Sequence, residues 1–223
     1  MDNGRWVTIR GHRVFIKDKS TNDYMNKKIR ENKQKEISKE NVGVHYGDLG
    51  KARDTYYWDI ESSNRSTGHY GTGTYFYSLE QDENNKALPH FSRGERPRHE
   101  VDFSEYKLFR PRNDFEAGML HDGLKAINYM SNFAEHHSEF DSLQNVLEYQ
   151  GIPRQASQEA FYKVRDIYYT PKYQNASYDS KLDSLSTIFM KELGYNGIDV
   201  RGIDGYDNSA YGSVIYDLNN KRK

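Results

Sequence analysis

The stretch from Ser62 to Tyr77, SSNRSTGHYGTGTYFY, decides how the rest of the sequence is interpreted. Gly68, Gly71 and Gly73 lie close together in it, and the β-prone run TYFY follows them directly. Glycine adopts backbone angles that other residues avoid, and it lets a ligand approach the main chain closely. A glycine-rich turn that leads into an aromatic strand therefore predicts one wall of a binding pocket. An ordinary turn between two strands would produce the same pattern.

The composition is polar but includes enough aromatic residues to form a core. Of its 223 residues 35% are hydrophobic and 29% are charged, and they include 19 tyrosines and 10 phenylalanines. Because aromatic side chains bury a large area each, we expect a small, tyrosine-rich core. The net charge of -1 argues against broad electrostatic capture of nucleic acid, which requires a basic face.

The residue types that are missing restrict the chemistry and the compartment. There is no cysteine, which excludes disulfides, thiolate zinc sites and a cysteine nucleophile. The sequence lacks the apolar core of a signal peptide at its start, and no apolar run reaches transmembrane length. We therefore expect a soluble, cytoplasmic protein with no membrane partner. We also expect no metal site, because His136 and His137 lack a matched carboxylate pair and adjacent helical residues diverge.

Residues 1–41 are expected to form a separate N-terminal part. The segment from Arg5 to Lys17 alternates apolar and polar residues around Arg10-Gly11-His12, which predicts a β-hairpin. The segment from Ser20 to Asn41 is rich in lysine and glutamate and predicts a solvated connector helix. The hairpin resembles a short module found at the C-terminal ends of tailed-phage head-morphogenesis proteins and ahead of phage-borne effector domains.

Residues 42–223 are expected to form one mixed α+β domain. Short β-prone runs come first, residues 112–193 are mainly helical in pattern, and the runs IDVR and SVIYDL come last. This order indicates a sheet with a helical region inserted between its strands.

The helical region shows several start signals. The segment from Asp114 to His136 has apolar residues at helical spacing, which predicts one long amphipathic helix. Asp141, Ser157 and either Asp183 or Ser184 are candidate N-caps for three further helices.

Three pieces of the domain occur in an informative order. His45-Tyr46-Gly47 ends an early β-prone run, GTGTYF follows at Gly71 to Phe76, and GYNGIDVR and YGSVIYD lie near the end. In this order they resemble the ADP-ribosyltransferase superfamily, and most nearly its phage-encoded and polyvalent-protein members of the histidine–tyrosine group. The resemblance covers residues 42–78 and 189–217 and leaves the central helices unexplained. It implies a split, two-sheet β-core that holds NAD in a bent shape.

The resemblance implies roles for the early strand and the glycine-rich strand. His45 would bond the hydroxyls of the adenosine-side ribose, and imidazole suits this task because it forms hydrogen bonds on two sides. Gly47 or the Tyr46 backbone would hold the carboxamide of NAD. Gly73 would belong to the cofactor-binding turn.

Further roles follow for the aromatic and hydroxyl side chains. Tyr75 would stack on the nicotinamide ring, and Tyr70 or Tyr57 would close the other face of that ring, since flat aromatic rings stack well. Ser66 and Thr67 would orient the catalytic acid or the ribose. The alternative for Tyr75 is a core aromatic on a strand.

The sequence departs from the superfamily pattern at two places. Tyr46 separates the histidine from the glycine, and no glutamate lies between Gly194 and Lys223, where the late strand usually supplies one. The acid would then be Asp207 or Asp204, just ahead of the last strand, unless both are ordinary turn residues. The predicted catalytic residues are therefore His45, Tyr75 and Asp207. Without an acid the chain would be an NAD-binding or inactive member.

The expected function is that of an NAD-dependent ADP-ribosyltransferase, or of an NAD glycohydrolase in which water is the acceptor. NAD would be the substrate and no metal would take part. The phage-like hairpin suits an effector that modifies a host protein or nucleic acid in the bacterial cytosol, expressed there or delivered by the virion. One alternative is a non-enzymatic phage accessory or host-inhibitor protein that binds a partner through tyrosines. Another is a nuclease or nucleic-acid binder that uses histidines and arginines. These are His12, His69, His90, His99, Arg93, Arg96 and Arg98.

Overall fold

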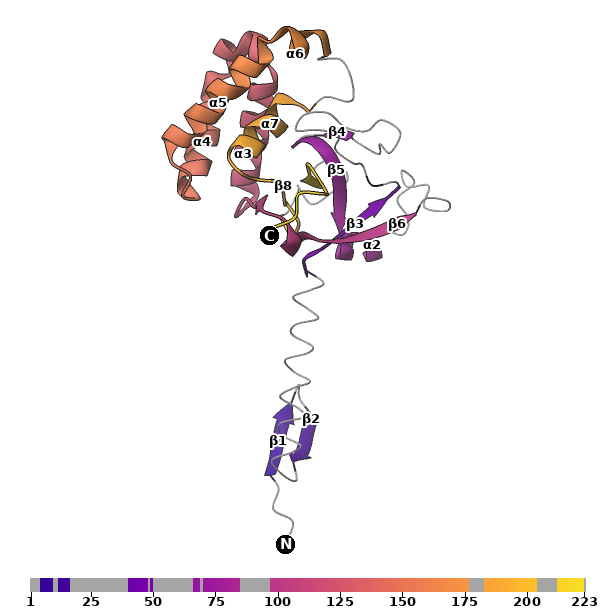
Figure 1. The fold of residues 1–223 in the computed structure, drawn as a ribbon. Helices are drawn as coiled ribbons and strands as arrows, with labels where there is room; N and C mark the ends of the chain where they lie inside the picture. Colours follow the sequence, from indigo (N-terminus) through magenta and orange to yellow (C-terminus); the bar gives the residue numbers. More distant parts are fainter. Residues whose placement is uncertain are drawn as a thin grey trace. The chain divides into compact units, whose positions relative to one another are not determined.

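The structure is a computed structural model of the chain. It describes residues 5–9, 12–16, 40–47, 49, 66–68, 70–84, 97–176, 183–203 and 212–222. The chain divides into two compact units, Met1–Asn41 and Val42–Lys223 (Figure 1). In the first unit β1 (Arg5–Ile9) and β2 (His12–Ile16) pair antiparallel. This confirms the predicted hairpin, whereas the predicted connector helix lies outside the described residues apart from its last two positions.

The second unit is built on one mixed sheet. Its strands are β3 (Val42–Tyr46), β4 (Ser66–Gly68), β5 (Gly71–Ser78), β6 (Arg98–Asp102), β7 (Leu108–Phe109), β8 (Gly197–Ile198) and β9 (Ser213–Ile215). Their order is β6-β3-β5-β9-β8-β7, and β4 pairs in addition with β5. Only the pair of β7 and β8 is parallel among the described pairings. The expected α+β class is confirmed at this level.

Strand β5 connects the parts of this sheet. Its residues 71–73 pair with β4, its residues 74–76 pair with β9, and its last two residues pair with β3. A Cβ atom added at Gly73 would lie 2.5 Å from the carbonyl oxygen of Ile215 on β9. Because a backbone atom cannot move aside cheaply, glycine at this position permits the close approach of β9.

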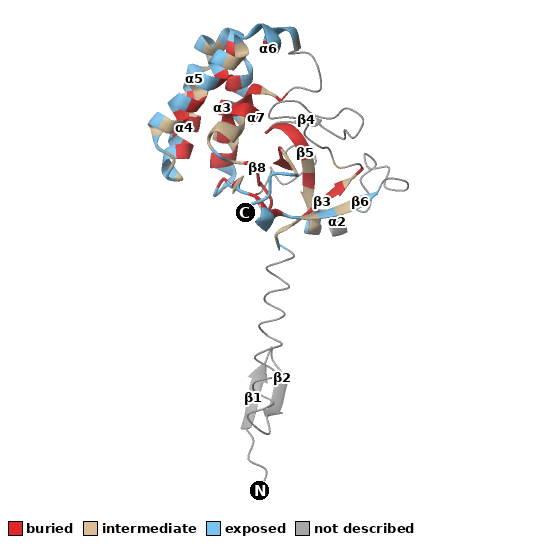
Figure 2. Cartoon of the chain, viewed as in Figure 1, coloured by how far each residue is buried: buried red, intermediate tan, exposed pale blue. Residues whose placement is uncertain are grey.

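Helices of the second unit lie mainly on one side of the sheet (Figure 1). They are α2 (Leu79–Asn84), α3 (Asp114–Asn128), α4 (His137–Tyr149), α5 (Arg154–Tyr168), α6 (Pro171–Ala176) and α7 (Leu185–Glu192), with 3-10 turns η2 (Phe103–Glu105) and η3 (Met130–His136). Figure 2 shows that α3 and α7 turn buried residues toward the sheet. Of the described helices, none has both the length and the apolar character needed to cross a bilayer.

The helix boundaries correct three predictions. The helix expected from Asp114 to His136 ends at Asn128, because the backbone leaves helical geometry at Tyr129 and continues as a 3-10 turn. Asp141 lies inside α4, which begins at His137. Ser157 lies inside α5, which begins directly after Pro153. Proline is tolerated at the start of a helix because the N–H that it lacks would have no partner there.

The start of α7 confirms one of the two predicted caps. The Ser184 side chain accepts a hydrogen bond from the backbone N–H of Thr187, which satisfies one of the free N–H groups of the first turn.

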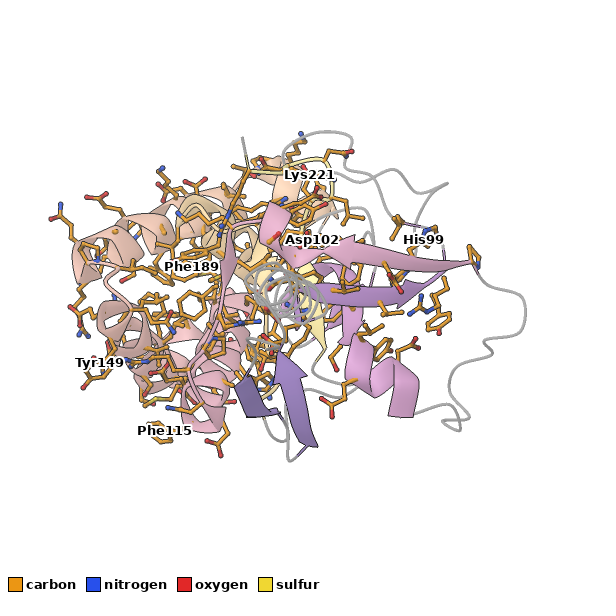
Figure 3. All side chains as sticks on the ribbon, turned by 90° about the horizontal axis from the view of Figure 1, so that it is seen from below. His99, Asp102, Phe115, Tyr149, Phe189 and Lys221 are labelled. Atoms are coloured by element: carbon orange, nitrogen blue, oxygen red, sulfur yellow. The ribbon has the colours of Figure 1, made fainter. Side chains whose placement is uncertain are left out.

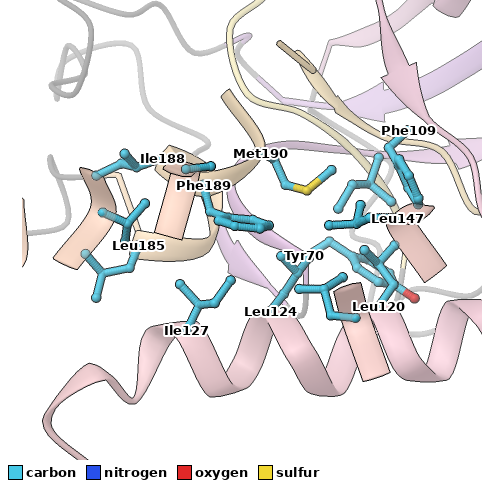
Figure 4. Close-up of a cluster of buried hydrophobic side chains, with 14 of the residues drawn as sticks. Tyr70, Phe109, Leu120, Leu124, Ile127, Leu147, Leu185, Ile188, Phe189 and Met190 are labelled. Carbon is cyan, nitrogen blue, oxygen red and sulfur yellow. The ribbon is translucent and has the colours of Figure 1, made fainter. Parts of the chain in front are cut away.

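Two apolar clusters lie on opposite faces of the sheet. The larger one joins α3, α4 and α7 to the sheet and includes Leu124, Phe189 and Val214 (Figure 4). The smaller one contains the buried residues Phe76, Phe103, Tyr106 and Ile215. Adjacent strand residues point to opposite faces, and Val214 and Ile215 follow this rule because they belong to different clusters. We call the two sides the helix face and the His45 face, after the histidine described below.

A hydroxyl network joins the glycine-rich start of β5 to α7. The backbone N–H of Thr72 donates to Thr187 Oγ1 at 2.7 Å, and the backbone N–H of Ser184 donates to Thr72 Oγ1 at 3.0 Å. Gly71 has a φ of +112°, and a Cβ atom there would lie 2.4 Å from Thr187 Oγ1. Glycine at this turn therefore serves the packing of α7 as well as the turn itself.

Candidate functional site

The three sequence pieces that carried the resemblance come together in the sheet. His45 lies on β3, the GTGTYF piece forms most of β5, and YGSVIYD supplies β9. Strand β3 pairs with β5, and β5 pairs with β9, both antiparallel. Segments that are distant in the sequence are therefore hydrogen-bonded neighbours.

His45 is buried and fixed in orientation. Its Nδ1 lies 2.9 Å from the carbonyl oxygen of Tyr75. A carbonyl oxygen can only accept, so Nδ1 carries a proton and donates to it. The ring also contacts Phe76, with 5.7 Å between centroids. On the other side His99 of β6 is its direct cross-strand partner (Figure 3).

Tyr75 does not face His45. Phe76 shares a face with His45. Tyr75 directly precedes Phe76 on β5, so the Tyr75 ring points to the opposite face. There it packs against the larger apolar cluster. The Tyr75 hydroxyl donates to the Gly71 carbonyl at 2.8 Å and accepts from the Tyr70 backbone N–H at 3.2 Å. His45 was expected to bind the ribose and Tyr75 to stack on the nicotinamide of the same NAD molecule, but their side chains lie on opposite faces of the sheet. Phe76 is the aromatic residue beside the imidazole.

The other residues predicted to bind NAD have structural contacts. The Gly47 backbone N–H donates to the Pro97 carbonyl at 2.8 Å, so it is already engaged. The Tyr46 hydroxyl donates to Asp82 Oδ1 at 2.6 Å. Tyr70 is fully buried in the larger cluster, which leaves no room for a ligand ring to stack on it.

Some predicted residues are described only in part or not at all. Ser66 and Thr67 lie on β4, opposite Gly73 and Thr72 of β5, but their side chains are outside the described residues. Asp207, Asp204 and Tyr57 lie outside the described residues entirely. Asp207 therefore stays a prediction.

The sequence interpretation missed a buried ionic network on the His45 face. Asp199 follows β8 and receives hydrogen bonds from Arg201 Nε and Nη2, both at 2.8 Å. Arg110 Nη2 donates to the same carboxylate at 2.6 Å, and the Ser213 hydroxyl donates to it at 3.0 Å. The spacing D-x-R places both side chains on one face of an extended segment, and this was the available signal in the sequence.

The network controls the ionisation of Asp199. Burial alone would raise the pKa of this carboxyl, but hydrogen bonds and positive charge from Arg201, together with the charge of Arg110, outweigh burial and hold the pKa below its usual range. The Arg201 guanidinium lies 4.1 Å from the centroid of Phe103, which links the network to the smaller apolar cluster. Ser213 is opposite Phe76 in the sheet. The network and His45 therefore flank the same aromatic residue.

A surface hollow of about 250 Å³ lies among the helices. It is lined by Asp122, Lys125, Ala126, Tyr129, His136 and Glu139. None of these is a predicted site residue. In the described part of the chain, no group of three or more histidine, aspartate or glutamate side chains is placed to hold a metal ion.

Comparisons with protein families, with curated proteins and with solved structures found no match to this chain. Its function therefore has to be argued from the residues themselves.

Proposed function

We propose that the protein is an NAD-dependent ADP-ribosyltransferase, a phage-encoded effector that modifies a host macromolecule. One observation carries the proposal. The histidine strand, the G-x-G-x-Y-F strand and the late strand are neighbours in the order β3–β5–β9. The resemblance requires these three strands to contribute to one site.

The geometry favours a site on the His45 face. His45 is the ribose-binding residue, with its ring oriented by the Tyr75 carbonyl. Phe76 is fully buried beside the imidazole and supports it from within the sheet, so it does not stack on the ligand. Tyr75 contributes its backbone carbonyl. Asp207 precedes Ser213 by a few residues, and Ser213 is paired with Phe76. The proposal assigns the catalytic carboxylate to Asp207.

These side chains suit cleavage of the bond between nicotinamide and ribose. That bond breaks as nicotinamide leaves with the bonding electron pair, and the ribose becomes oxocarbenium-like before the acceptor nucleophile adds to it. A nearby carboxylate stabilises the positive charge that develops on the sugar. An imidazole fixed by a backbone carbonyl binds the dinucleotide without a change of ring orientation, which lowers the cost of reaching the productive geometry.

The test is nicotinamide release from NAD by the purified chain, together with transfer of label from NAD to bacterial macromolecules. We expect His45→Ala and Asp207→Asn each to reduce release by about a hundredfold or more. Tyr75→Phe is the matched control because it removes only a hydroxyl that bonds the Gly71 and Tyr70 backbone. Equal loss in a folded Tyr75→Phe protein would contradict the assignment to the His45 face. Failure of the unmodified protein to release nicotinamide with any acceptor would contradict the transferase proposal.

A second candidate function is non-enzymatic binding of a host protein. Phe115 and Tyr149 are 70% and 74% exposed, and they lie at neighbouring ends of α3 and α4 (Figure 3). Exposed aromatic side chains that lie close together are typical of interfaces. If Phe115→Ala with Tyr149→Ala removes toxicity on expression in bacteria while NAD is never consumed, binding is the better account.

A further inference from the structure

Two arginines share one buried carboxylate at the ends of β7 and β8. Arg201 binds Asp199 through Nε and Nη2, and Arg110 binds the same group through Nε and Nη2. The carboxylate also accepts from the Arg201 backbone N–H and the Ser213 hydroxyl. Two positive charges therefore meet one negative charge, and the cluster keeps a net charge of about +1 at neutral pH.

One of the two guanidinium groups is almost out of contact with water. The Arg201 side chain is 4% exposed, whereas that of Arg110 is 55% exposed. Arg201 Nη1 is buried and has no hydrogen-bond partner among the described residues. Guanidinium carries five N–H donors, and a buried donor of a charged group without an acceptor is costly.

The contact with Phe103 compensates only part of this cost. The ring lies 4.1 Å from Arg201 Cζ, and its π-electrons attract the cation. A phenyl ring provides no oxygen for the N–H groups of Nη1. Thr74 Oγ1 is a second buried polar atom without a partner in the described part of the chain. It is also on the His45 face, because Thr74 is two residues from Phe76 along β5. Among the described residues, buried polar atoms without a partner therefore occur at two places on this face.

We propose that Arg201 and Arg110 bind a phosphoryl group. A phosphate oxygen bound at Arg201 Nη1, with Arg110 as the second guanidinium, would supply the missing acceptor and balance the net positive charge. Guanidinium groups are well suited to this because their N–H pairs match the spacing of phosphate oxygens. The ligand would approach from the side of Arg110, whose side chain is open to solvent. Asp199 and Ser213 position the arginines and do not touch the ligand.

This site does not depend on transferase activity. Its ligand is either an inorganic phosphate or diphosphate, or the diphosphate of a nucleotide. These sources are distinguished by titrating the full chain with sodium phosphate, sodium pyrophosphate and ADP by calorimetry, with sodium chloride of equal ionic strength as the control. Tighter binding of ADP than of pyrophosphate would identify a nucleotide ligand. Equal binding would identify the free diphosphate.

The decisive variant is Arg110→Gln. Arg110 is half-exposed and Asp199 keeps Arg201, so this protein should fold, and we expect its affinity for pyrophosphate to fall about tenfold. Arg165→Gln is the matched control, because Arg165 is a half-exposed arginine on α5 with its own carboxylate partner, Asp166. It should bind as the unmodified protein does. His45→Ala should also keep its pyrophosphate affinity, which separates this proposal from the transferase.

Two outcomes would overturn the phosphate site. One is that phosphate, pyrophosphate and ADP all fail to bind the unmodified protein beyond the chloride control. The other is that Arg110→Gln and Arg165→Gln bind pyrophosphate equally well. Either result would show that Asp199 and the two arginines form only a structural clamp.

Discussion

The two faces of the central sheet carry different kinds of side chain. On the helix face a large apolar cluster is covered by α3, α4 and α7, and the polar groups of the adjoining turn are paired, as Thr72 is with Thr187. On the His45 face the buried apolar cluster contains four of the described residues. They lie beside a buried imidazole, a buried ionic network and polar atoms that have no partner among the described residues.

The helix face therefore supplies most of the stability, and the His45 face holds the groups that are suited to chemistry. Apolar burial is the main favourable term in folding, and most of it lies on the helix face. Buried ionisable groups are expensive to keep and are often found at functional sites. Tyr75 was expected to touch a ligand, but its side chain belongs to the helix face, which holds the fold together.

The largest expected effect is on the helix face. Phe189→Ala removes a fully buried ring of α7 that contacts Phe140 of α4 and belongs to the larger apolar cluster (Figure 4), and we expect it to lower the free energy of unfolding by about 3–5 kcal/mol. Urea denaturation measures this. The exposed Phe115→Ala is the control and should change the value by less than about 0.5 kcal/mol. Similar losses for both would show that this cluster does not dominate stability.

The next effect tests the ionic network of the His45 face. Asp199→Asn leaves the buried Arg201 without its charge partner and should cost about 3 kcal/mol at neutral pH. Because the pKa of Asp199 is lower in the folded state than in the unfolded chain, its contribution is present above the unfolded pKa and is lost as the pH falls through the folded value. The difference between variant and unmodified protein in urea denaturation should therefore shrink below about pH 4. A difference that stays constant to pH 2.5 would contradict this.

A pair of isosteric changes compares polar groups on the two faces directly. Thr187→Val removes the acceptor of a buried backbone N–H and should cost about 2 kcal/mol. Thr74→Val removes a buried hydroxyl that has no partner in the described part of the chain, and it should leave the free energy of unfolding unchanged or raise it. Thermal or urea unfolding of the two proteins side by side decides this, and a large loss for Thr74→Val would show that its hydroxyl is bonded.

The smallest expected effect concerns Tyr75, which was expected to face a ligand and instead lies on the helix face. Tyr75→Phe removes one hydroxyl that bridges Gly71 and Tyr70, so it should cost about 1 kcal/mol. Unfolding experiments measure this cost, and the nicotinamide assay shows that it is separate from activity. If stability is unchanged but nicotinamide release is lost, the hydroxyl acts on a ligand and the division between the faces is wrong.

Local signals in the sequence predicted several local features correctly, although the caps expected at Asp141 and Ser157 were wrong. The hairpin at Arg5–Ile9 and His12–Ile16, the cap at Ser184 and the mixed α+β class each depend on patterns within short windows. The face occupied by Tyr75 was not predictable in this way. Alternation shows that Tyr75 and Phe76 point apart, but which of them meets the helices depends on where residues far along the chain pack.

The ionic network was hidden for the same reason. Asp199 and Arg201 are two residues apart, but Arg110 joins them across 89 positions of sequence. The break after Asn128 also depends on context, because the apolar spacing continues through Met130 and Phe133 while the backbone does not stay helical. The face of Tyr75 and the position of Arg110 depend on contacts between distant parts of the chain, which a single sequence does not reveal.

The position of β5 has a consequence for how the molecule opens. Because this strand pairs with β3, β4 and β9 along its eight residues, none of these partners can be lost without exposing part of it. Local fluctuations at the chain ends or the outer helices would leave its amides protected. In hydrogen–deuterium exchange, the ladder amides of β5 should be among the last to exchange, and their rate should report on unfolding of the whole second unit.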